Sequence, residues 1–163
     1  MNKSTTKIGL YSRKVAHQAL LNVLERGVPL STALSDIPGY LELETNDKAL
    51  AKQLLMTTLR RYNQLDSVIN PMLDKPLGPK GLPVTLWMML GAAQILFMNV
   101  ENYAAVNTTV EMVSRDRKSS VRAKKNLVNA ILRNITREFD TIKFNIQEKP
   151  KEALAPWLRE RWE

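Results

Sequence analysis

LPVTLWMMLGAAQILFM, residues 82–98, is the stretch that decides the fold, because it is apolar on nearly every face of a helix. A helix that is hydrophobic all round belongs either in a protein core or in a membrane. A bilayer span needs about 20 consecutive apolar residues, whereas residues 84–100 are interrupted by Thr85, Gly91, Gln94 and Asn99. We therefore predict a buried central helix in which Gln94 hydrogen-bonds to buried backbone groups.

Helical spacing of apolar residues continues upstream of this stretch. It predicts a first helix that Ser12 caps and Gly27 ends, followed by a short helix over 29–35. A longer helix is predicted to begin at Thr45 or Asn46 and to reach Pro71. Four polar residues of the first helix fall outside its apolar stripe: Arg13, Lys14, His17 and Gln18.

Three more segments follow downstream. Asn102 is expected to cap one helix, and a last core helix is expected over 120–138. The alternation of apolar and polar residues over 142–146 predicts an extended segment laid over the helices, and Pro156 is expected to start a short amphipathic helix with Trp157. The apolar stripe of the last core helix consists of Val121, Leu127, Val128, Ile131, Leu132 and Ile135.

These patterns predict an all-α fold, a compact bundle of about six or seven helices with a C-terminal linker helix. The 163 residues correspond to one ordinary domain, and 44% of them are hydrophobic, which is enough to fill one core. We expect a helical domain over residues 1–138 and a separate segment over residues 139–163.

The composition excludes several kinds of site. The chain has no Cys, and its single histidine is His17, so disulfides, thiolate metal ligands, a cysteine nucleophile and a histidine pair for zinc are excluded. We expect no catalytic group, no metal and no cofactor site in this chain. The N-terminal residues lack a long apolar run, which predicts no secretory signal, a cytoplasmic location and no membrane partner.

Positive charge is concentrated in one part of the sequence. Residues 115–137 hold eight basic residues against Asp116, a net charge of +7 out of +8 for the whole chain. Concentrated charge of one sign is typical of a protein with a polyanionic partner, although a solvated helix face gives the same composition. On a helix, five polar or basic residues would share one side: Arg122, Lys125, Asn126, Asn129 and Arg133.

Four segments together resemble, in order, the helices of the NusB-like RNA-binding domain: SRKVAHQALLNVLE, TTLRRYNQLD, LWMMLGAAQILFMNVENYAAVNTTVEMV and KKNLVNAILRNITRE. The resemblance covers residues 12–138 and is most specific at AAVNTTVEM (104–112) and LVNAILR (127–133). The tail EALAPWLRERW (152–162) is similar to the segment that follows this domain in the RsmB, Sun or Fmu family of bacterial 16S rRNA cytosine-C5 methyltransferases.

The resemblance implies an RNA-binding accessory domain that positions rRNA for a downstream catalytic domain outside this chain. That domain would bind S-adenosylmethionine, and this chain alone is expected to be non-catalytic, with rRNA and its own catalytic domain as partners. Charge and resemblance together predict ten RNA-binding residues: Arg13, Lys14, Arg115, Arg117, Lys118, Arg122, Lys124, Lys125, Asn129 and Arg133.

Two other functions stay open at this point. One is a free-standing antitermination factor of the NusB type, which binds single-stranded RNA together with a ribosomal protein. The other is a helical protein-interaction module whose basic face meets an acidic partner. RNA binding with a steep salt dependence separates the first two functions from the third.

Overall fold

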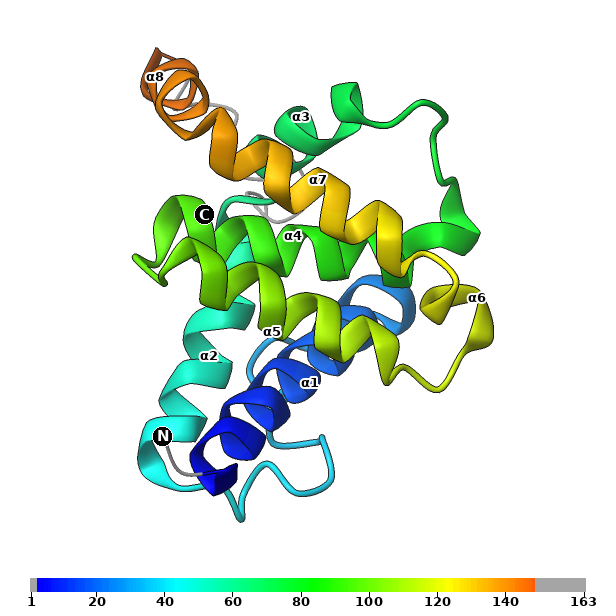
Figure 1. The fold of residues 1–163 in the computed structure, drawn as a ribbon. Helices are drawn as coiled ribbons and strands as arrows, with labels where there is room; N and C mark the ends of the chain where they lie inside the picture. Colours follow the sequence, from blue (N-terminus) through cyan, green and yellow to red (C-terminus); the bar gives the residue numbers. More distant parts are fainter. Residues whose placement is uncertain (1–2, 149–163) are drawn as a thin grey trace. The chain divides into compact units, whose positions relative to one another are not determined.

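A computed structural model describes residues 3–148, which form eight α-helices and two 3₁₀ turns and contain no strand (Figure 1). The predicted all-α class is confirmed. The chain divides into two compact units, residues 1–56 and the residues from 57 onward. The helix predicted to begin at Pro156 lies outside the described residues.

The first unit contains α1 (Lys3–Arg26) and most of α2 (Thr45–Arg60). Helix α1 ends where predicted, because Gly27 has φ +65°, a backbone conformation that glycine adopts without strain. The start of α1 was predicted wrongly. Ser12 lies inside the helix, and its hydroxyl donates to the carbonyl of Asp47 at 3.0 Å instead of capping a helix N-terminus.

The short helix predicted over residues 29–35 is replaced by consecutive turns. Most backbone hydrogen bonds here span three residues, as from Thr32 N–H to the Pro29 carbonyl at 3.1 Å. A helix of so few residues is marginal by itself, because nucleation is costly. The phenol of Tyr11 donates to the carbonyl of Pro38 at 3.0 Å, which ties these turns to α1.

The helix predicted to reach Pro71 is divided. Helix α2 ends at Arg60, α3 (Tyr62–Ile69) begins after Arg61, and the 3₁₀ turn η1 (Asn70–Met72) contains Pro71. The backbone at Arg61 departs from helical geometry, with φ −104° and ψ 16°. The apolar stripe continues across this break, since Leu59 and Leu65 are both fully buried.

Helix α4 (Leu82–Phe97) is the centre of the second unit, as the sequence predicted. The 3₁₀ turn η2 (Pro79–Gly81) leads into it, and α3, α5 (Asn102–Ser114) and α7 (Lys125–Arg137) pack against it. Figure 1 shows α5 and α7 beside α4. As predicted, Gln94 donates to buried backbone, the carbonyl of Leu90, at 3.0 Å.

One segment, Pro79–Phe97, is long and apolar enough to cross a membrane by length and composition alone. Of its most apolar window, 72% is buried inside the protein. Core helices pass the same test, and this degree of burial favours a core helix.

Two details of the second unit differ from the prediction. Asn102 is the first residue of α5 and not its cap: the cap position is Glu101, which makes no side-chain capping bond. The helix predicted over 120–138 is divided into α6 (Ser119–Arg122) and α7. Its apolar stripe is nevertheless largely buried, at Val121, Val128, Ile131, Leu132 and Ile135.

Residues 139–148 form helix α8 (Phe139–Glu148), so the predicted extended segment is wrong. The alternating residues include Ile142 and Ile146, whose spacing of four also suits one face of a helix. The ammonium of Lys143 donates to the carbonyl of Leu96 at 2.7 Å and lies 5.0 Å from the centre of the Phe97 ring. This bond ties α8 to the C-terminal end of α4, where helix carbonyls lack partners within the helix.

Candidate nucleic-acid interface

The loop between α5 and α6 is organised by Asp116, the single acid in the basic run. One carboxylate oxygen of Asp116 accepts the indole N–H of Trp87 on α4 at 3.2 Å. The other accepts the backbone N–H of Lys118 at 3.0 Å. The carboxylate therefore connects this loop to the core helix, while Arg117 and Lys118 remain exposed.

Arg122 has a structural role in the same loop. Its guanidinium donates to the carbonyls of Asp116 at 2.6 Å and Arg117 at 2.9 Å. Arg122 lies on α6, not on the same helix as Lys125 and Arg133, so the predicted single helical face for these residues is wrong. The side chain is still exposed, and its remaining N–H groups can donate to an anion.

The N-terminus of α7 concentrates positive charge. Lys124 occupies the cap position without a side-chain capping bond, Lys125 is the first helical residue, and the first turn holds no acid. The free N–H groups and the dipole of a helix favour anions at this end, so two cations there oppose helix stability by about 0.3–1 kcal/mol each. The positive end of the helix dipole and the charges of the two lysines both attract an anion.

Further along α7, Asn129 and Arg133 follow Lys125 at steps of four residues. Such steps keep side chains on one side of a helix, here over about 12 Å along its axis. Lys125 and Arg133 are exposed and Asn129 is half-buried. Lys125 and Arg133 therefore place two exposed cations on one side of α7.

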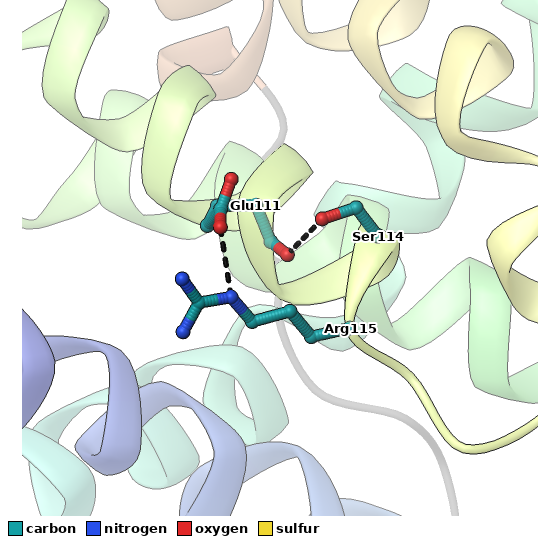
Figure 2. Close-up of polar contacts among 3 residues, drawn as sticks. All are labelled: Glu111, Ser114 and Arg115. Atoms are coloured by element: carbon teal, nitrogen blue, oxygen red, sulfur yellow. Dashed lines mark hydrogen bonds and ion pairs between the residues drawn. The ribbon is translucent and has the colours of Figure 1, made fainter.

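Arg115 is less available than the sequence suggested. Its guanidinium forms an ion pair with Glu111 one turn earlier on α5, at 2.8 Å (Figure 2). The carbonyl of Glu111 also accepts the hydroxyl of Ser114 at 2.6 Å. An exposed pair of this kind is weak, but it neutralises the charge of Arg115.

Two expectations for α1 are wrong. Arg13 and His17 were predicted to lie outside the apolar stripe, yet only 8% of Arg13 and 5% of His17 is exposed. The guanidinium of Arg13 donates to the carbonyl of Gly9 at 2.9 Å, and burial lowers the pKa of Arg13. Lys14 is exposed, as predicted.

Lys14 belongs to the first unit, whereas six exposed cations of the second unit remain together as the candidate site. None of them forms an ion pair with a carboxylate among the described side chains, residues 9–147. In the same range, no three His, Asp or Glu side chains come together as metal ligands. We call the following six residues the basic surface: Arg117, Lys118, Arg122, Lys124, Lys125 and Arg133.

Sequence reasoning missed two lysines near this surface, Lys75 and Lys80. Both lie in the segment between α3 and α4, and the structure places them around one groove with Lys118 and Lys124. The segment is rich in Pro and Gly and lacks periodicity, so no sequence pattern indicated its position in the fold. The role of Asp116 in anchoring the loop was missed as well, although a single acid within a run of basic residues could have indicated a structural role.

Loss of the hydrogen bond between Trp87 and Asp116 should have a measurable effect on stability and on the α5–α6 loop. We expect Trp87→Phe to lower the free energy of unfolding by about 1–3 kcal/mol, because Asp116 loses its buried hydrogen-bond donor. Without this bond the carboxylate is free to turn, and the backbone amide of Lys118 should exchange faster with solvent. Urea unfolding and amide exchange by NMR would measure both effects. An unchanged exchange rate at Lys118 would show that the indole does not hold the loop.

The described residues form an all-α domain with a basic surface built on the α5–α7 connection. The chain belongs to the NusB family, whose family model matches residues 11–137. This agrees with the resemblance noted in the sequence.

Several curated relatives carry the same name, ribosomal RNA small subunit methyltransferase B. The protein from Proteus mirabilis is 31% identical over 150 residues, which cover 91% of this chain and 34% of the relative. The protein from Cronobacter sakazakii is 30% identical over 152 residues, which cover 93% of this chain and 34% of the relative. The chain therefore spans about a third of the length of these relatives.

Proposed function

We propose that this chain is an RNA-binding accessory domain that positions 16S rRNA for cytosine-C5 methylation by a downstream catalytic domain. The single observation that carries the proposal is the basic surface. Six exposed cations within 17 residues face solvent without a carboxylate partner in the described part of the chain. Membership of the NusB family and the similarity to rRNA methyltransferases support RNA as the polyanion.

In this proposal the basic surface supplies affinity and orientation. Contacts to phosphates fix the register of a protein on nucleic acid but carry no sequence information. The choice of the target cytosine would then rest with the catalytic domain, which would also bind S-adenosylmethionine. Such a protein would work where rRNA is assembled, in the bacterial cytoplasm.

The relatives favour this proposal over the free-standing antitermination factor. Their names describe a methyltransferase, and their similarity to this chain extends over more than nine-tenths of it. The reading frame that follows Glu163 distinguishes the two functions. A frame that continues into a glycine-rich domain with two cysteines supports the accessory role, and a stop codon supports the free-standing factor.

RNA binding itself is tested by titrating the chain with fluorescent fragments of 16S rRNA at several salt concentrations. Six phosphate contacts on single-stranded RNA predict a slope of log affinity against log salt of about −4. Binding with a slope near zero, or no binding at low salt, would contradict the proposal. Binding to an acidic peptide in place of RNA would support the protein-interaction module instead.

A further inference from the structure

Two aromatic side chains of the second unit are largely exposed to solvent. They are Tyr103 on α5, which is 73% exposed, and Phe144 on α8, which is 63% exposed. Both lie near the C-terminal end of α4, because Tyr103 follows Phe97 by six residues and Phe144 adjoins Lys143, whose ammonium contacts the Phe97 ring. Scattered exposed apolar side chains are normal, whereas several gathered in one region mark an interaction surface.

The helices that carry these two rings cannot bury them against their own unit. Residues two positions apart point to nearly opposite sides of a helix, about 200° around its axis. Ala105, two residues after Tyr103, is fully buried, and Ile142, two residues before Phe144, is 7% exposed. Turning either helix to cover its ring would therefore expose a core residue.

Helix α8 is also held in this orientation by its contacts with the end of α4. The guanidinium carbon of Arg61 lies 4.6 Å from the centre of the Phe97 ring, and the Lys143 ammonium lies 5.0 Å from it. Cations are attracted to the face of an aromatic ring, and the Lys143 ammonium donates to the carbonyl of Leu96 as well. We call the following five exposed or half-buried residues the apolar end: Phe97, Met98, Val100, Tyr103 and Phe144.

The apolar end and the basic surface lie at opposite ends of α4. Pro83 and Val84, at the start of α4, line the groove that Lys118 and Lys124 border. Helix α4 has 16 residues, and a helix rises 1.5 Å per residue, so its two ends are about 24 Å apart. A partner on the apolar end therefore leaves the basic surface free to bind RNA.

We propose that the apolar end is the docking surface for the domain that follows residues 1–163 in the same polypeptide. The proposal rests on the proposed function, which requires such a domain. Helix α8 is the last helix of the described residues, and the chain continues from Glu148, four residues after Phe144. The relatives support this occupant, because this chain spans only 34% of their length. A covalently joined domain has a high effective concentration at this end, so a small apolar surface is enough to hold it. A second copy of this chain is the competing occupant.

The first test compares the full-length protein with residues 1–163 by hydroxyl-radical footprinting, which oxidises exposed side chains. We expect Tyr103 and Phe144 to be oxidised at least about fivefold more slowly in the full-length protein, because the core of an interface is packed like a protein interior. Leu41, 67% exposed in the first unit, is the internal control and should react equally in both. Equal oxidation of Tyr103 and Phe144 in the two proteins would overturn the proposal.

The second test uses variants that remove or keep the two rings. In the full-length protein, Tyr103→Gln/Phe144→Gln should lower the thermal unfolding midpoint of this domain to the midpoint of residues 1–163. Tyr103→Phe/Phe144→Tyr, which keeps both rings, and Leu41→Gln should leave it unchanged. In residues 1–163, the Gln variant should change neither the midpoint nor the affinity for RNA, because both rings are exposed. An equal loss of stability in the two proteins would show that the rings stabilise their own unit, and would overturn the proposal.

Failure of the docking surface and failure of the proposed function are distinguishable. If residues 1–163 bind RNA and Tyr103 is unprotected in the full-length protein, the docking surface is wrong and the proposed function stands. A reading frame that stops at Glu163 overturns both. If residues 1–163 self-associate in sedimentation and the Gln variant does not, the apolar end pairs two copies of the chain and the proposal is wrong.

Discussion

Replacing Lys124, Lys125 and Arg133 together by Glu is expected to weaken RNA binding by about 100-fold or more at about 0.1 M salt. Each lost phosphate contact reduces the salt slope by about 0.7–0.9. Three lost contacts then account for about two orders of magnitude in affinity, and the three new negative charges add repulsion. Fluorescence anisotropy with an rRNA fragment measures the change.

The fold of this triple variant should be retained. All three residues are exposed, and exposed substitutions usually change stability by about 0.5 kcal/mol or less. Glu at positions 124 and 125 also suits the N-terminus of α7, which favours negative charge. Arg122 is left unchanged, because its bonds to the carbonyls of Asp116 and Arg117 hold the loop together.

A matched control carries the same change in net charge. Arg26, Lys48 and Lys52 are basic residues of α1 and α2 outside the basic surface, and replacing them by Glu also lowers the net charge from +8 to +2. This control should keep most of the affinity. If it loses as much affinity as the first variant, binding depends on net charge and not on a site. If neither variant loses affinity for RNA, the basic surface is only a solvated face of the protein.

Gly91→Val is expected to lower the free energy of unfolding by about 3 kcal/mol, because the core has no room for a side chain at this position. Even a single Cβ at Gly91 would come within 2.6 Å of Leu132 Cδ1 and 2.8 Å of Cδ2. Leu132 on α7 is fully buried, so its side chain can shift only by repacking against its neighbours in the core. The close contact between α4 and α7 therefore depends on glycine. Ala130→Val, at an exposed position of α7, is the control and should change stability little.

A double-mutant cycle tests whether contact with Leu132 causes the loss of stability in Gly91→Val. Leu132→Ala alone should cost about 2–5 kcal/mol through the cavity it leaves. Because valine at position 91 would fill part of that cavity, the double variant should lose at least about 1 kcal/mol less than the sum of the single variants. Urea unfolding followed by circular dichroism measures all four states. Strict additivity would show that Gly91 and Leu132 do not constrain each other.

Sequence periodicity correctly predicted those elements whose apolar pattern fits only one kind of secondary structure. Residues 82–98 are apolar all round, so a central helix was the simplest arrangement, and α4 is that helix. The alternation over 142–146 had two explanations, a strand and one side of a helix, and the contact of Lys143 with the end of α4 was not visible in the sequence. Ser12 was misplaced for a similar reason, since its partner, Asp47, lies 35 residues away.

The site was partly predictable because most of its charge is contiguous in the sequence. Lys124 and Lys125 could be found from the charge run alone. Arg13 was assigned to the interface from its charge and from the resemblance of the first helix, and neither shows how much of a side chain is covered: only 8% of Arg13 is exposed. Lys75 and Lys80 were missed because only the folded chain brings their loop to the groove.

The most direct test of the basic surface as the RNA interface is lysine footprinting. Residues 1–163 would be acetylated with and without an rRNA fragment, and the modified lysines located by mass spectrometry. We predict that bound RNA protects Lys118, Lys124 and Lys125, while Lys48 and Lys52 on α2 react as in the free protein. Unchanged acetylation of Lys118, Lys124 and Lys125 under conditions where the RNA is bound would contradict the account.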